Sequence, residues 1–111
     1  MFPEFIRQLP AADVDFSGAQ AWLLSSPDGQ VGFWSFPEGG SVPAHRHGPQ
    51  IGVVLSGCVT LTVEGETHEV KAGNMFTLED LELHSATVAP GTYVIEVYRD
   101  ADRHKPLDEP K

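Results

Sequence analysis

The segment Pro43 to Gly57, PAHRHGPQIGVVLSG, joins two histidines to an apolar, β-branched run that ends in glycine. The run Ile51 to Leu55 has the composition of a buried β-strand. On a strand, His45 and His47 face the same way, because side chains alternate, and their Cα atoms lie about 7 Å apart. Two imidazoles in this arrangement can bind one metal ion. The segment therefore predicts a strand that carries a metal-binding pair.

Gln50 follows His47 by three residues, so on an unbroken strand its side chain would face away from both histidines. Gly48 and Pro49 lie between them. Glycine accepts unusual backbone angles and proline removes a ladder donor, which is typical of a bulge or a short loop. We therefore expect the alternation to be reset and Gln50 to turn toward the histidines.

The remainder of the chain also reads as short strands. In Val59 to Glu64 every second residue is apolar, and Gly65-Glu66 is predicted to be a two-residue turn into a strand at Thr67 to Val70. Similar runs, bounded by Gly, Pro, Asp or Ser, lie at residues 21–25, 30–36, 51–55, 75–78, 83–88 and 93–98. No segment shows a sustained helical period. The pattern predicts an all-β sandwich or barrel.

Size and charge limit the possible roles. A chain of 111 residues has room for one domain, residues 1–111, with a barrel core at about 20–100 and a charged tail at 101–111. A net charge of −9 disfavours nucleic acid and anionic membranes as partners. A small anionic substrate would need a cation in the pocket, such as a metal or an arginine. A single cysteine and the lack of a signal-peptide pattern indicate a cytoplasmic protein.

Two spacings resemble the two motifs of the cupin superfamily. The first motif is matched by Gly39, His45, His47, Gln50 and Gly57. The second is matched by Gly73 and, after ten residues, His84. The chain departs from the first motif in one respect that concerns the site, since Gln50 stands after two intervening residues where glutamate usually stands after three or four.

The resemblance implies a double-stranded β-helix, the jelly-roll barrel of cupins. It also implies one divalent metal ion (Zn, Ni, Mn or Fe) held by His45, His47, His84 and Gln50. Three imidazoles and an amide are neutral, so the ion would keep its full charge, which favours a Lewis acid. The alternative is that the histidines fill a polar barrel mouth without a metal.

Within the superfamily, HRHGPQIGVVLSG (residues 45–57) followed by VEGETHEVKAG (residues 63–73) is most similar to small cupins that linearise unsaturated uronates. Those proteins carry an Asp-x-Phe pair, to which Glu96 and Tyr98 correspond. The resemblance implies a sugar-acid substrate, with these two residues as catalytic groups and Glu96 moving a proton. An iron-dependent dioxygenase and a non-catalytic binding or sensing protein remain as alternatives, and Glu96 could instead be a solvated surface acid.

Two aromatic residues and four basic residues outside the two motifs are further residues of interest. Trp34 and Phe36 share one strand face, where they either fill the core or form the apolar wall of the pocket. The basic residues Arg99, Arg103, His68 and His104 are predicted to lie outside the site, although an arginine could bind a substrate carboxylate.

The N-terminal segment suggests self-association. Phe2, Phe5 and Ile6 are apolar and have no evident strand partner in their own chain. The cupin resemblance implies dimers that form through sheet faces or an exchanged N-terminal strand. We therefore expect a homodimer.

Overall fold

The computed structural model describes residues 1–14 and 18–107, which form nine strands and one short helix, α1 (Glu4–Arg7). The strands are β1 (Gln20–Ser26), β2 (Gly29–Phe36), β3 (Gly40–His45), β4 (Gln50–Ser56), β5 (Cys58–Val63), β6 (Glu66–Lys71), β7 (Met75–Leu78), β8 (His84–Val88) and β9 (Thr92–Tyr98). No helix in the described residues is long and apolar enough to cross a membrane.

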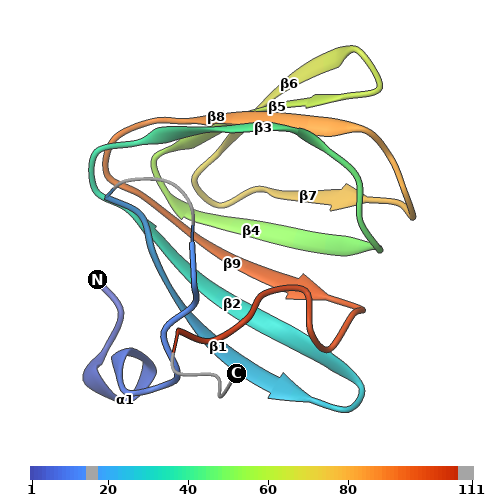
Figure 1. Ribbon diagram of the computed structural model, residues 1–111. Coiled ribbons are helices and arrows are strands. Elements are labelled where there is room, and N and C mark those ends of the chain that lie inside the picture. Colours follow the sequence, from blue (N-terminus) through green and yellow to red (C-terminus); the bar gives the residue numbers. More distant parts are fainter. Residues whose placement is uncertain (15–17, 108–111) are drawn as a thin grey trace.

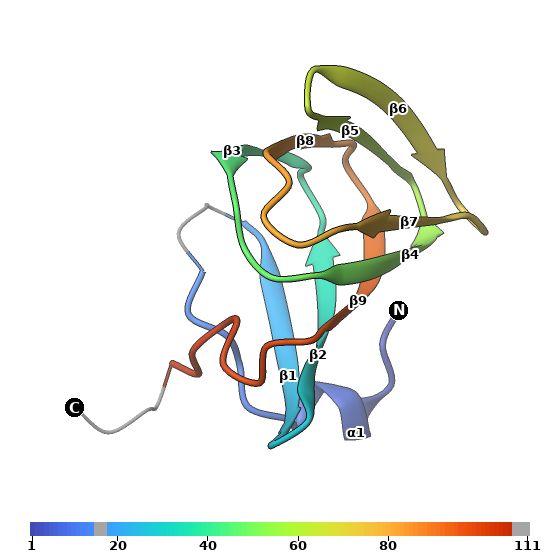
Figure 2. The same ribbon diagram turned by 90° about the vertical axis from the view of Figure 1, so that its right-hand side faces the viewer.

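The strands form two antiparallel sheets that face each other (Figure 1). The larger sheet has the order β1-β2-β9-β4-β7, and the smaller has the order β3-β8-β5-β6. A view turned by 90° shows the sheet edge β3 on one side of the molecule and the strand β4 of the other sheet below it (Figure 2). This architecture is a jelly-roll β-sandwich, which confirms the predicted all-β barrel.

Alternation along the strands sorts the side chains into an interior and an exterior set. On β9, Thr92, Val94 and Tyr98 are buried, whereas Val97 is exposed. The interior set contributes one apolar core that includes Leu23, Trp34, Phe36, Val54, Leu61, Phe76, Leu78, Val88 and Val94. The core lies between the sheets, and several of its members also line a cavity that contains polar side chains.

Glycine is required where the chain turns beside a neighbouring strand. Gly57 has a φ of 80°, and a Cβ atom there would lie 2.1 Å from Thr92 Oγ1. No side chain fits in that space, so the glycine that ends the quoted segment is fixed by both its backbone angle and its packing.

The predicted turn between β5 and β6 is one residue out of place. β5 ends at Val63 and β6 begins at Glu66, so the two loop residues are Glu64 and Gly65 rather than Gly65 and Glu66. Both have positive φ, 47° and 85°, as the mirror-image turn of a tight hairpin requires. The strand pairing determined by this turn agrees with the predicted alternation.

The prediction that His45 and His47 lie on one strand and face the same way because of its alternation is wrong, since only His45 lies on a strand. β3 ends at His45, and β4 begins at Gln50 in the other sheet, so residues 46–49 cross from one sheet to the other. Gly48 and Pro49 lie in this short connection, as predicted, and Gln50 is buried and lines the same cavity as the histidines. A further irregularity in pairing lies within β3, between Val42 and His45. The two histidines therefore meet because the chain changes sheets.

The N-terminal segment and the C-terminal tail, the latter as far as residue 107, pack on the barrel, although Phe2 was expected to have no strand partner in its own chain. Phe2 is buried and its ring lies edge-on to Trp22, Phe33 and Tyr93 at centroid distances of 6.1, 5.7 and 5.5 Å. It thus has partners in its own chain, whereas Phe5 is 70% exposed. The predicted charged tail folds back in front of β2 and β9 as far as residue 107 (Figure 1). Its last four residues, 108–111, lie outside the described part of the chain.

Candidate metal centre

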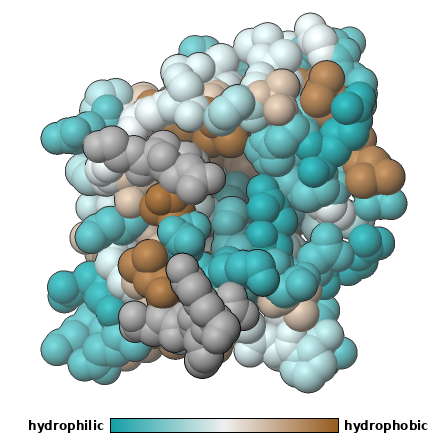
Figure 3. Space-filling model, in the orientation of Figure 1, coloured by the Kyte–Doolittle hydropathy of each residue, from teal (hydrophilic) through white to brown (hydrophobic). Residues whose placement is uncertain are grey.

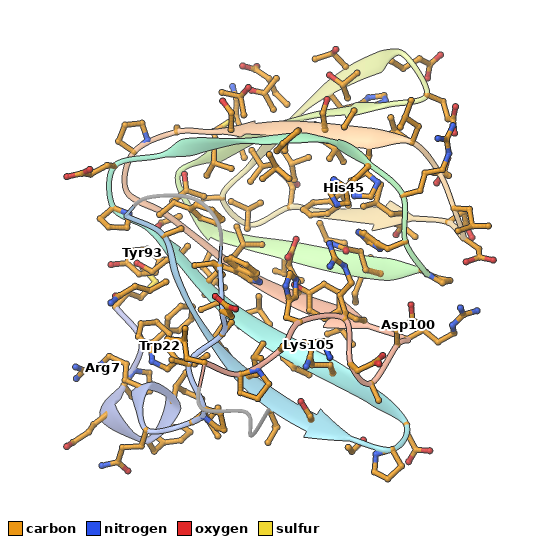
Figure 4. The ribbon with its side chains drawn as sticks, viewed as in Figure 1. Arg7, Trp22, His45, Tyr93, Asp100 and Lys105 are labelled. Carbon is orange, nitrogen blue, oxygen red and sulfur yellow. The ribbon has the colours of Figure 1, made fainter. Side chains whose placement is uncertain are left out.

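Three histidines from different parts of the chain converge at the open end of the barrel. His45 ends β3, His47 lies in the loop between the sheets and His84 begins β8. Their ring centroids are 4.3 to 5.1 Å apart, and one ligand nitrogen from each lies within 4.8 Å of the others. Figure 4 shows His45 pointing into the space between the sheets. Three nitrogens bound to one zinc ion lie about 3.3 Å apart, so small side-chain rotations bring this set onto one ion.

Each imidazole is held by a backbone carbonyl. His45 Nδ1 lies 2.8 Å from Pro43 O, His47 Nδ1 lies 2.7 Å from Gly48 O and His84 Nδ1 lies 2.9 Å from Glu82 O. A carbonyl oxygen can only accept, so each Nδ1 carries the hydrogen and each Nε2 keeps its lone pair. The three rings are thus fixed in the tautomer that a metal site needs.

Burial favours the neutral imidazole at His47 and His84. The pKa of His47 is lowered to about 4, chiefly by burial and also by the positive charge of Arg103, while its hydrogen bond to Gly48 opposes the shift. The pKa of His84 is also lowered, chiefly by burial. Neutral imidazole is the form that binds a metal, so His47 and His84 are in the metal-binding form at neutral pH.

A hydrogen-bonded chain leads from the metal cluster into the core. Gln50 Nε2 donates to Glu96 Oε2 at 2.9 Å, the Tyr98 hydroxyl donates to Glu96 Oε1 at 2.6 Å, and Trp34 Nε1 donates to the Tyr98 hydroxyl at 2.9 Å. Because the amide nitrogen of Gln50 is bound to a carboxylate, its oxygen is available to another partner. Glu96 therefore lies inward with two donors, and the alternative of a solvated surface acid is not what the structure shows.

Opposing effects act on the pKa of Glu96. Burial raises its pKa, while the bonds from Tyr98 and Gln50 and the charge of Arg103 oppose that rise. The pKa of Tyr98 is raised well above its ordinary value by burial and by the adjacent Glu96. Tyr98 thus remains a hydroxyl donor at neutral pH, and Glu96 is the member of the pair that can exchange a proton.

The cluster opens into a cavity of about 110 Å³ between the sheets. Its walls are apolar and include Trp34 and Phe36, whose rings stack at a centroid distance of 5.7 Å. Its polar lining consists of His45, His47, Gln50, His84, Glu96, Arg103 and His104. Figure 3 shows hydrophilic side chains gathered at the centre of this face of the molecule.

Arg103 and His104 were predicted to lie outside the site but line its cavity. Arg103 Nη2 lies 3.3 Å from His45 Nε2, and the His104 ring packs against Trp34 at 5.1 Å. No spacing in the sequence marks either residue, because both lie beyond the last strand. Arg99, in contrast, is exposed and pairs with Asp80 and Asp100.

Comparison with known proteins agrees with this geometry. The structure of KdgF from a Halomonas species has a TM-score of 0.74 and 26% identity, covering 86% of this chain and 91% of that one. An RmlC-like cupin from Shewanella frigidimarina has a TM-score of 0.76 and 21% identity, covering 87% and 88%. Salicylate 1,2-dioxygenase from Pseudoaminobacter salicylatoxidans has a TM-score of 0.71 and 17% identity, covering 88% of this chain and 31% of that one.

No curated protein matches the sequence significantly. The family model described as a cupin domain matches residues 32–98, which include every predicted ligand and both predicted catalytic residues. The donor set also suits a divalent metal, since one ligand nitrogen from each of three imidazoles meets in a single group and the amide of Gln50 lines the same cavity. The chain therefore belongs to the cupin domain family.

Proposed function

We propose that the protein is a metal-dependent cupin enzyme that opens the ring of an unsaturated uronate. The observation that carries the proposal is the convergence of three metal-ready imidazoles with one inward carboxylate, Glu96, in a single cavity. Support also comes from the likeness to KdgF, which is a cupin of the uronate-linearising kind that the sequence motifs resemble.

The metal ligands in this proposal are His45, His47, His84 and the Oε1 atom of Gln50. When bound, a divalent ion would supply Lewis-acid polarisation of a substrate oxygen. Glu96 orients Gln50 for this role, because it binds the amide nitrogen and leaves the amide oxygen for the ion.

Arg103 is the candidate group for the substrate carboxylate. Its Nε atom is buried and has no hydrogen-bond partner among the described residues, and its guanidinium lines the cavity. An unsatisfied buried donor costs about 1–3 kcal/mol, and a bound carboxylate would remove that cost. The guanidinium is also permanently charged, so it offsets the −9 net charge that would otherwise repel an acid.

The proposed reaction is an isomerisation in which one proton moves within the substrate. Glu96 takes the proton of the anomeric hydroxyl as the bond between the anomeric carbon and the ring oxygen breaks, which leaves an aldehyde and an enolate. Glu96 then returns that proton to the ring-opened chain at the carbon next to the new ketone. During both steps the Tyr98 hydroxyl holds the side chain of Glu96 in place through its 2.6 Å hydrogen bond. No oxidant or other reactant is consumed.

The test is to supply a 4,5-unsaturated uronate to the zinc-, nickel- or manganese-loaded protein and to follow the ultraviolet absorbance of the conjugated carboxylate. We expect the absorbance to disappear faster than it does without enzyme. Glu96→Gln should slow it about 100-fold or more, the range that a positioned acid–base group contributes. The matched control is Glu69→Gln, an exposed acid on β6, which should leave the rate unchanged.

A second function, an iron-dependent dioxygenase, is favoured by one observation. The cavity walls include Trp34, Phe36 and Phe76, which suit a planar aromatic acid better than a polyhydroxylated sugar. Dioxygen uptake by the iron-loaded protein with a hydroxybenzoate would support this alternative. A ligand that binds the barrel while neither assay shows turnover would instead indicate a binding or sensing protein.

We also propose that the protein acts as a homodimer through the outer face of the larger sheet. Leu24, Val31, Val97 and Ile51 form one row across β1, β2, β9 and β4. Leu24 is 53% and Val97 is 41% exposed. This row carries no charge on a protein of net charge −9, so a second copy can approach here with little electrostatic repulsion. Sedimentation at micromolar concentration tests the proposal, and a monomer would contradict it.

A further inference from the structure

Gln30 has a buried side-chain amide that takes no part in the three-histidine group. It lies on β2 and is 3% exposed, beside Tyr98 in the strand register. Burying an amide is unfavourable unless its donors and acceptor are paired. Gln30 meets that requirement in full: Nε2 donates to Ser25 Oγ at 3.0 Å and to His104 O at 2.9 Å, and Oε1 accepts from His104 N at 2.9 Å.

Two of these three hydrogen bonds are made with the backbone of His104, which lies 74 positions away in the chain. That residue belongs to the C-terminal strap, which we define as residues 99–107. The strap is also tied to the N-terminal segment by Asp13 N donating to Lys105 O at 2.7 Å and Leu107 N donating to Ala11 O at 2.9 Å. Figure 4 shows Lys105 in this strap, in front of β2. Gln30 thus joins the strap to the barrel wall next to the cavity.

The strap carries the two cavity-lining groups that come from outside the strands. Arg103 precedes His104 in the chain, and its Nη2 atom lies 3.3 Å from His45 Nε2. The ring of His104 itself lies edge-on to Trp34 and Tyr98 at 5.1 and 5.2 Å. A shift of the backbone at residue 104 would therefore move the guanidinium and the imidazole together.

We propose that Gln30 is a positioning residue that sets the affinity of the cavity for carboxylate ligands by fixing the backbone of His104 and, through it, the guanidinium of Arg103. The inference rests on the proposed function, which assigns Arg103 to the substrate carboxylate. Gln30 touches neither the metal cluster nor the proposed ligand. Its effect is specific to the charge of the ligand, because what it places is a cation.

The test compares D-galacturonate with neutral D-galactose as calorimetric probes on the zinc-loaded protein. Gln30→Leu keeps the approximate size but removes all three bonds. We expect it to weaken galacturonate binding at least tenfold while galactose binding and zinc content stay at wild-type values. Ser25→Ala is the matched control, because it removes the one Gln30 bond that does not reach the strap, and it should leave galacturonate binding unchanged.

A double variant separates positioning from general loss of structure. If Gln30 acts through Arg103, then Gln30→Leu in an Arg103→Met background adds no further loss of galacturonate binding. An independent full tenfold loss in that background would overturn the inference. If Gln30→Leu does not fold, Gln30→Glu replaces it, because glutamate keeps the shape of the side chain but cannot donate to His104 O. This variant should show the same selective loss of galacturonate binding. Wild-type galacturonate affinity in Gln30→Glu would overturn the inference.

The failures of the two proposals are distinguishable. Unchanged galacturonate binding in Arg103→Met would remove the carboxylate role of Arg103, and the proposed function and this inference would both fall. A loss in Arg103→Met with no loss in Gln30→Leu would overturn the positioning role alone and leave the proposed function standing.

Discussion

The substitution Tyr98→Phe removes one oxygen from the centre of the buried hydrogen-bonded chain. That oxygen accepts from Trp34 Nε1 at 2.9 Å and donates to Glu96 at 2.6 Å. Loss of an acceptor for a buried indole N–H costs about 1–3 kcal/mol, and a hydrogen bond to a charged group contributes about 1.5–3 kcal/mol. Because Glu96 keeps its bond from Gln50, we expect a total destabilisation of about 2–4 kcal/mol rather than the full sum.

The measurement is urea unfolding followed by tryptophan fluorescence at pH 7, with Tyr93→Phe as the matched control. Tyr93 lies on the opposite face of the same strand, so its hydroxyl is remote from the chain. A small domain has an m-value of about 1–3 kcal/mol per molar urea, so the Tyr98→Phe midpoint should fall by about 1 M or more. Equal midpoints for the two variants would refute the argument that the Tyr98 hydroxyl joins Trp34 to Glu96.

Three further outcomes follow from the structure. First, the pKa of His104 is lowered to about 4 by burial and by Arg103, so the unfolded chain takes up a proton that the folded chain does not as pH falls from about 6.5 to 4. The metal-free protein should lose stability over that range, and His104→Phe should reduce the slope by up to about 1.4 kcal/mol per pH unit; equal slopes in urea titrations would contradict this. Second, Val97→Lys should convert the proposed dimer to monomer in sedimentation, and an unchanged mass would exclude the outer sheet face. Third, Gly57→Ala should destabilise by more than about 1 kcal/mol, because its φ of 80° and the contact with Thr92 are both unfavourable to a Cβ; a wild-type melting temperature would contradict the packing.

The strands could be predicted because each is short, alternates in polarity and ends at a turn residue. The two-residue loop between β5 and β6 was placed one residue late, since either Glu64-Gly65 or Gly65-Glu66 puts glycine in the turn. Strand β3 was not separated from β4, because the apolar run after Pro49 hides the change of sheet. That change depends on contacts with β8 and β9, which are distant in sequence.

The histidines of the candidate site could be found from their spacing, but the groups around them could not. Arg103 and His104 line the cavity, and the backbone of His104 makes two hydrogen bonds with Gln30, 74 residues away in the chain. Nothing local to the tail signals that contact. Phe2 is a similar case, since its aromatic partners come from three strands that assemble only in the folded barrel.

The most direct test of the metal centre is elemental analysis of protein purified without a histidine tag. The wild type and the His68→Ala control, whose histidine is exposed on β6, should each hold close to one divalent ion per chain. His45→Ala and His84→Ala should lose most of that metal, because each removes one of three converging Nε2 donors. Wild-type metal content in both of these variants would contradict the proposed site.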